Sequence, residues 1–187
     1  MTTAYDAPHD ELEGPYWNKT RLGLVVVVVL IIAMWVWIYV FAPRTNPDRL
    51  TNREFVTQAE TLCAPYAQQI LDIPPGNTAT TPAERARQVE LGTDITREMI
   101  EALEVAAAQV TDPDEVEILE AWFVDWRAYV ADREAHIVRL ESATADSSAR
   151  DLAFTLTERA SGGFYTRRID GLANVNGMTS CRVPEDV

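Results

Sequence analysis

The chain has 187 residues, of which 47% are hydrophobic and 24% are charged, and its formal net charge is −13. This length predicts one folded domain with an appendage. After residue 42, acidic residues outnumber arginines 25 to 14 and lysine does not occur. We therefore expect neither nucleic acid nor anionic lipid headgroups to bind this part of the chain.

Residues 1–15 contain four acidic residues, two prolines and few apolar side chains. Such a composition cannot bury enough apolar surface to fold, so we predict a disordered acidic tail.

Residues 22–42, LGLVVVVVLIIAMWVWIYVFA, run for 21 positions without a charge. As a helix they would extend about 31 Å, which matches the roughly 30 Å hydrocarbon core of a bilayer. A buried core helix would need neighbours on every side, and a cleavable signal peptide would have a shorter apolar stretch. With Tyr16 and Trp17 as interfacial rings, residues 16–42 are predicted to form an uncleaved transmembrane anchor that contacts the membrane through residues 22–42.

Two cysteines stand far apart in the chain, at Cys63 and Cys181. Two thiols make half of a structural zinc site, and neither His9 nor His136 is placed to complete it, so we expect no metal and no cofactor. A disulfide between the start and the end of one domain is the favoured interpretation, with two unrelated free thiols as the alternative. Because such a bridge persists outside the cytoplasm, residues 43–187 are predicted to be extracytoplasmic.

The resulting topology is a single-pass protein of the cell membrane with a cytoplasmic amino terminus. The basic residues on the two sides of the span do not by themselves decide this orientation.

Residues 43–51 contain Pro43 and Pro47 and are predicted to be a short linker to a helical bundle at 52–187. Two helix starts are marked by caps, one by Thr81 with Glu84 completing a capping box and the other by Asp112. The tight turn between these two helices predicts antiparallel neighbours. No alternating strand pattern of convincing length is present, so the fold class is all-α. The expected helices are 52–71, 82–110, 115–142, 149–157 and 166–174.

The helix at 115–142 carries an unusual stripe of large side chains at helical spacing, formed by Trp122, Trp126, Tyr129 and Arg133. These rings either fill the centre of the bundle or form a site for a ligand or partner, and both interpretations stay open. His136 extends the same face and is expected to be an interior or boundary group rather than a base.

Catalytic patterns are not found in the sequence. Glu98, Glu101 and Glu104, with the acidic residues of 112–120, are expected on solvated faces and at helix starts, and the serines lack a defensible histidine partner. We therefore predict a protein that is not an enzyme and that binds an envelope protein as an accessory or interaction subunit. The alternative is a small-molecule binding module with a pocket at the aromatic helix.

Several segments together carry a resemblance: PYWNKTRLGL, NPDRLTNREF, AETLC, TTPAERA, AWFVDWRAYVADRE and NVNGMTSCRVPEDV. With these segments the chain resembles a group of actinobacterial single-pass membrane proteins for which no activity is known. The resemblance implies an amino-terminal anchor and an outer helical domain, and it assigns no catalytic residue.

Overall fold

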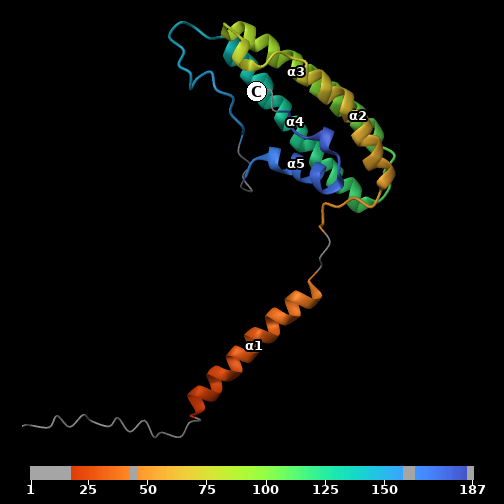
Figure 1. Ribbon diagram of the computed structural model, residues 1–187, viewed down its shortest axis with the longest axis vertical. Helices are drawn as coiled ribbons and strands as arrows, with labels where there is room; N and C mark the ends of the chain where they lie inside the picture. The colour runs from red at the N-terminus through yellow and green to blue at the C-terminus, as the bar shows by residue number, and fades with distance from the viewer. Residues whose placement is uncertain (1–17, 43–45, 158–162, 185–187) are drawn as a thin grey trace, which may run out of the picture. The chain divides into compact units, whose positions relative to one another are not determined.

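The computed structural model describes residues 18–42, 46–157 and 163–184, and these residues form five α-helices and two short 3-10 helices (Figure 1). No strand occurs within these ranges, in agreement with the all-α prediction. The predicted tail at 1–15 lies outside the described residues. The elements are α1 (Lys19–Phe41), α2 (Arg53–Leu71), η1 (Gly76–Thr78), α3 (Pro82–Ala107), α4 (Pro113–Glu141), α5 (Tyr165–Asn176) and η2 (Thr179–Cys181).

The chain divides into two units, residues 1–45 and residues 46–187. The first unit contains α1, whose 23 residues are all exposed and which has no polar face. At 1.5 Å per residue this helix is about 34 Å long. As the sequence predicted, α1 is long and apolar enough to cross a membrane.

The second unit is a bundle built on three long helices. Helix α3 packs against both α2 and α4, α5 packs against α4, and η2 packs against α2 and α5. Figure 1 shows α2 and α3 lying lengthwise beside each other, with the shorter α5 against α4. The core between these elements includes Phe55, Ala59, Met99, Leu103, Trp126, Ile169 and Met178.

Side-chain caps explain where the long helices begin. The side-chain oxygen of Asn52 accepts a hydrogen bond from the Phe55 amide at 2.9 Å and starts α2. Asp112 accepts from the amides of residues 114 and 115 and starts α4, as predicted. At α3, Thr81 accepts from the Glu84 amide at 3.1 Å. The Glu84 carboxylate accepts from the amide and the hydroxyl of Thr80, both at 2.8 Å, so it reaches one position beyond the cap residue to which a capping box returns.

The predicted helix at 149–157 is wrong. These residues form turns followed by extended chain. The Asp151 carboxylate accepts from both the amide and the hydroxyl of Ser148, at 3.0 and 2.7 Å, and such local bonds compete with helix formation. Beyond this turn Leu152, Phe154 and Leu156 are half-buried while their neighbours are exposed, which is the period of two of an extended segment.

The second unit begins at Asn46, within the segment 43–51 that the sequence predicts to be a linker. Leu50 is buried in the core, and its amide donates to the side-chain oxygen of Asn176 at 2.9 Å. The Asn176 side-chain amide in turn donates to the Asp48 carbonyl at 2.9 Å. The end of α5 therefore holds the first residues of the unit in place.

Glu115 also holds the first residues of this unit in place. Its carboxylate accepts from the Thr51 amide, from the Thr51 hydroxyl at 2.7 Å and from the Asn52 amide at 3.1 Å. Glu115 is buried, contrary to the prediction that the acidic residues of 112–120 are solvated. Its burial is stabilised because three donors satisfy the carboxylate.

Candidate functional site

Cys63 and Cys181 form a disulfide, as predicted, with their α-carbons 5.2 Å apart across a sequence separation of 118. Both residues are fully buried. The Glu60 carboxylate adds polar links beside the bridge, because it accepts from the Ser180 amide at 2.9 Å and from the Ser180 hydroxyl at 2.7 Å. The segment that follows α5 is thus attached to α2 by a covalent bond and by hydrogen bonds.

The aromatic stripe of α4 lies in the core. Trp122, Trp126 and Tyr129 are buried and meet edge to face, with ring centroids 6.1 and 5.9 Å apart along the stripe. The Trp122 indole donates to the carbonyl of Ile169 at 3.2 Å and so ties α4 to α5. This arrangement is the geometry that aromatic side chains prefer in protein interiors.

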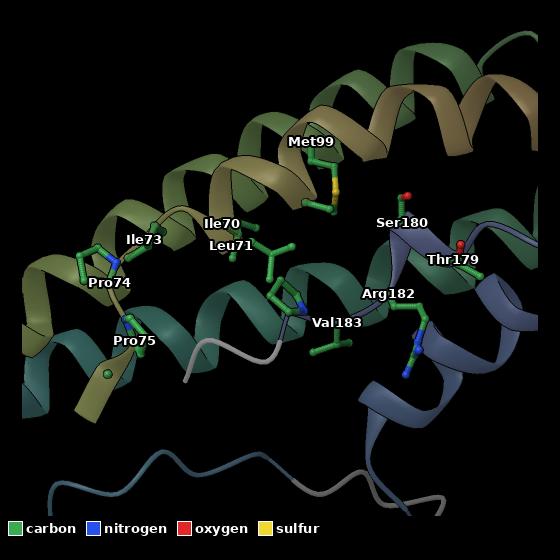
Figure 2. A pocket seen from close by; sticks show the side chains of 13 residues that line it. Ile70, Leu71, Ile73, Pro74, Pro75, Met99, Thr179, Ser180, Arg182 and Val183 are labelled. Atoms are coloured by element: carbon green, nitrogen blue, oxygen red, sulfur yellow. The ribbon is translucent and has the colours of Figure 1, made fainter. Parts of the chain in front are cut away.

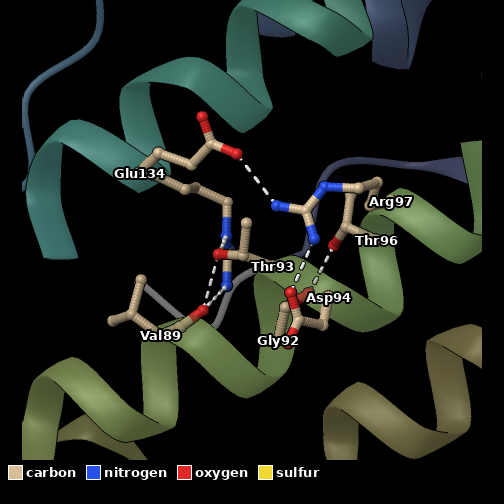
Figure 3. A network of polar contacts seen from close by, with 8 residues as sticks. Val89, Gly92, Thr93, Asp94, Thr96, Arg97 and Glu134 are labelled. Carbon is tan, nitrogen blue, oxygen red and sulfur yellow. Dashed lines mark hydrogen bonds and ion pairs between the residues drawn. The ribbon is translucent and has the colours of Figure 1, made fainter.

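Arg133, the fourth member of the stripe, is also fully buried. Its guanidinium donates to the Thr93 hydroxyl at 2.9 Å, to the Tyr129 hydroxyl at 2.8 Å and to the Val89 carbonyl at 3.2 Å. Figure 3 shows Val89 and Thr93 on one turn of α3, facing α4. Arg133 therefore joins α3 to α4 in the interior.

A surface ion-pair group lies beside this buried arginine. Arg97 of α3 contacts Asp94 at 2.6 Å and Glu134 of α4 at 2.8 Å, and all three side chains are solvent-accessible (Figure 3). Exposed pairs of this kind add little stability each. The buried Arg133 contacts therefore define the α3–α4 junction more than the surface pairs do.

His136 is buried, and its ring meets that of Phe154 at 5.4 Å. Burial, together with the positive charges of Arg139, Arg85 and Arg133, lowers the pKa of His136 to about 4. The imidazole is therefore neutral at pH 7. It acts as an interior group, consistent with its expected role.

An acidic hollow of about 380 Å³ lies between the first turns of α4 and the middle of α5. Its charged lining residues are Asp48, Asp114, Glu117, Asp125 and Arg168. Asp125 is fully buried, and one of its carboxylate oxygens lies 3.0 Å from the Arg168 Nε. Trp122 also lines this hollow, whereas Trp126 and Tyr129 do not.

An apolar groove, also of about 380 Å³, lies between the end of α2 and the segment that follows α5 (Figure 2). One wall consists of Ile70, Leu71 and the turn at 73–76, and the other of residues 179–184. Met99 of α3 also lines it. Leu71 is 76% exposed.

The apolar groove was not predicted from the sequence. The one local sign of it is that α2 ends in an apolar pair, Ile70 and Leu71, directly before Pro74-Pro75-Gly76. The opposite wall comes from the far end of the chain and could not be assigned from local pattern.

Within residues 18–42, 46–157 and 163–184, no group of three or more histidine, cysteine or acidic side chains is placed to hold a metal ion. No protein-family model, curated protein or solved structure matches the chain. The fold and the site together define a helical, disulfide-bonded domain with a buried aromatic centre and an open apolar groove.

Proposed function

We propose that this chain is a single-pass membrane protein whose helical domain lies outside the cytoplasm and acts as a binding or accessory subunit of a cell-envelope complex. Helix α1 is its anchor, with the amino terminus in the cytoplasm. The domain is an antiparallel bundle that binds a protein partner and catalyses no reaction. Kinship with actinobacterial single-pass proteins is part of the same proposal.

The observation that carries the proposed location is the disulfide between Cys63 and Cys181. Structural disulfides persist in oxidising compartments and are rare in the cytoplasm. Helix α1 supports the anchor, because it has the length and composition of a membrane span.

The buried polar side chains of the domain hold its elements together. Arg133 joins α3 to α4, Glu115 holds the start of α2, and Asn176 holds residues 48 and 50. These groups stabilise the fold. The antiparallel arrangement is supported by the short connection at 108–112 between α3 and α4.

The location is tested by labelling with a membrane-impermeant maleimide in intact cells. Asn77→Cys, at an exposed loop position, is expected to react without lysis. Thr3→Cys is the matched control and is expected to react only after the cells are broken. Labelling of Thr3→Cys with protection of Asn77→Cys would reverse the orientation and contradict the proposal.

The partner is tested by placing a photo-crosslinking amino acid at exposed apolar positions outside the apolar groove, namely Leu91, Val105 and Val138. At least one position is expected to yield a defined crosslinked protein in native membranes. The exposed positions Asn77 and Arg150 serve as polar controls. Absence of any product from all three apolar positions would contradict the accessory-subunit role.

Small-molecule binding, the alternative function, is better placed at the apolar groove than at the aromatic helix. Trp126 and Tyr129 are fully buried, whereas Leu71 in the groove is open to solvent.

A further inference from the structure

We infer that the apolar groove binds a fatty acid, with its hydrocarbon chain between the two walls and its carboxylate at Arg182. This inference is independent of the proposed protein partner, because it depends only on the end of α2, Met99 and residues 179–184.

The lining of the groove suits a flexible hydrocarbon chain. Ile70, Leu71 and Ile73 line it from the end of α2, and Val183 and Pro184 line it from the segment after α5. None of the described lining residues is aromatic. Flat ligands are held best by stacking on rings, which this lining does not offer. A volume of about 380 Å³ is near the lower end of the 300 to 1,000 Å³ that is usual for small-ligand sites. That size favours one acyl chain over the two chains of a phospholipid.

The charges at the groove select an anionic end group. Among residues 46–157 and 163–184, no acidic residue lines the groove, and Arg182 is the one charged lining residue. This local pattern contrasts with residues 43–187 as a whole, where acidic residues outnumber arginines 25 to 14. Arg182 lines the groove and is exposed, and its side chain points toward α5, away from Ile70 and Leu71 (Figure 2). An arginine in this position can hold a carboxylate outside the apolar part of the groove.

The carboxylates that contact the second wall are already engaged. Glu60 accepts from Thr179 and from Ser180, at 3.3 and 2.9 Å. Asp170 accepts from the Val183 amide at 2.9 Å. These bonds hold the second wall in place and engage both carboxylates with it. The guanidinium of Arg182 therefore supplies the positive charge that binds the ligand.

Both walls are fixed before any ligand arrives. The disulfide joins α2 at Cys63 to Cys181, which lies between two residues of the second wall, Ser180 and Arg182. A pocket held in this way needs little ordering on binding, which is typical of small-ligand sites.

The test uses the full-length protein in phosphatidylcholine nanodiscs and palmitate that carries a photoreactive diazirine in its chain. The crosslinked peptides, identified by mass spectrometry, are expected to contain residues 70–76 or 179–184. The alcohol with the same chain and diazirine is the charge control. A phospholipid with the same photoreactive chain, built into the nanodisc, is the control for bilayer lipid.

Two matched pairs of variants make the test specific. Leu71→Asp is expected to lower labelling by palmitate at least about tenfold, because it places a charge in the apolar groove. Leu91→Asp, at another exposed leucine outside the groove, is expected to leave labelling unchanged. Arg182→Gln is expected to lower palmitate labelling about tenfold, through loss of a charge-assisted bond, and to leave alcohol labelling unchanged. Arg150→Gln is the corresponding control at an exposed arginine.

Equal labelling of the two aspartate variants, or labelling confined to α1, would overturn the groove as the site. Equal labelling by the alcohol and the acid, with no effect of Arg182→Gln, would overturn the carboxylate. Labelling by the photoreactive phospholipid in place of palmitate would assign the groove to bilayer lipid and overturn the fatty acid. An intact disulfide on non-reducing gels, checked in every variant, shows that the domain is folded.

Discussion

The aromatic stripe of α4 and the apolar groove are both apolar, yet one is closed and the other is open. The stripe is covered on several sides, because α3, α5 and the extended segment around Phe154 all pack against α4. The groove is bordered by the last turn of α2, by the turn after it and by the segment that begins with η2, and Leu71 stays 76% exposed among the described residues.

Large aromatic rings therefore do not mark the open apolar surface of this domain. Large rings bury more area than aliphatic side chains and are drawn to the most enclosed position. The smaller aliphatic side chains of the groove remain where the number of neighbouring elements is lowest. The comparison leads to predictions on both regions, beginning with the largest effect.

Trp126→Ala should cause the greatest loss. Removal of a fully buried ring from the stripe is expected to lower the free energy of unfolding by about 3 to 5 kcal/mol. Urea unfolding of the full-length protein, followed by circular dichroism, measures this change. Trp126→Phe should lose less, because it leaves a smaller cavity. Near-normal stability of Trp126→Ala would mean that the stripe is not the core of the domain.

Replacement of both cysteines by serine should have the next largest effect on stability and should also affect the groove. Loss of a disulfide that closes a long loop is expected to cost about 2 to 5 kcal/mol. Because Cys181 lies between Ser180 and Arg182 of the second wall, palmitate labelling is also expected to fall. The unfolding midpoint and the labelling yield are the two readouts, and wild-type protein under reducing conditions is the control. Unchanged labelling in a destabilised variant would show that the groove does not depend on the bridge.

A pH effect on stability is expected at His136, which lies on the same face of α4 as the aromatic stripe. Burial, with the nearby arginines, lowers its pKa from 6.5 to about 4, so the folded state favours the neutral imidazole. This contribution is fully present above pH 6.5 and is lost as the pH falls from 6.5 through 4. It amounts to about 3 kcal/mol at 1.36 kcal/mol per pKa unit.

Urea unfolding at pH 7, 5.5 and 4 measures the effect, with His136→Gln as the variant that does not titrate. The wild type is expected to lose more stability than His136→Gln over this range. Parallel pH profiles for the two proteins would contradict a buried neutral histidine.

The smallest effect on stability is expected at the groove itself. Leu71→Asp should change the free energy of unfolding by no more than about 0.5 kcal/mol, because the side chain is 76% exposed. Leu91→Asp, at 53% exposure, is the control and should behave alike. Thermal unfolding of both variants checks this expectation. A large loss in Leu71→Asp alone would mean that the groove wall is part of the core.

Much of the fold could be predicted because its signals are local. The caps at Thr81 and Asp112 depend on residues within one helical turn, and α3 and α4 begin where these caps indicate. The segment at 149–157 was assigned wrongly, since its alternation of Leu152, Phe154 and Leu156 is short and follows a polar turn.

Less of the candidate site could be predicted from the sequence. The stripe of α4 was identified as a unit, but periodicity alone did not distinguish a filled core from an open ligand site. Arg133 was placed on the correct face, whereas its burial depends on Val89 and Thr93 of another helix. Those contacts are not encoded in the spacing along α4.

The sequence by itself determined a helix long and apolar enough to span a membrane and the starts of α3 and α4. These features follow from composition and from hydrogen bonds within a few residues. It favoured a bond between Cys63 and Cys181, and the fold brings their α-carbons within 5.2 Å. Only the tertiary structure decided that Leu71 is exposed, that Glu115 and Asn176 hold the first residues of the domain, and that an apolar groove exists. The physical reason is that each of these depends on side chains far apart in the chain, whose contacts arise only when the helices pack.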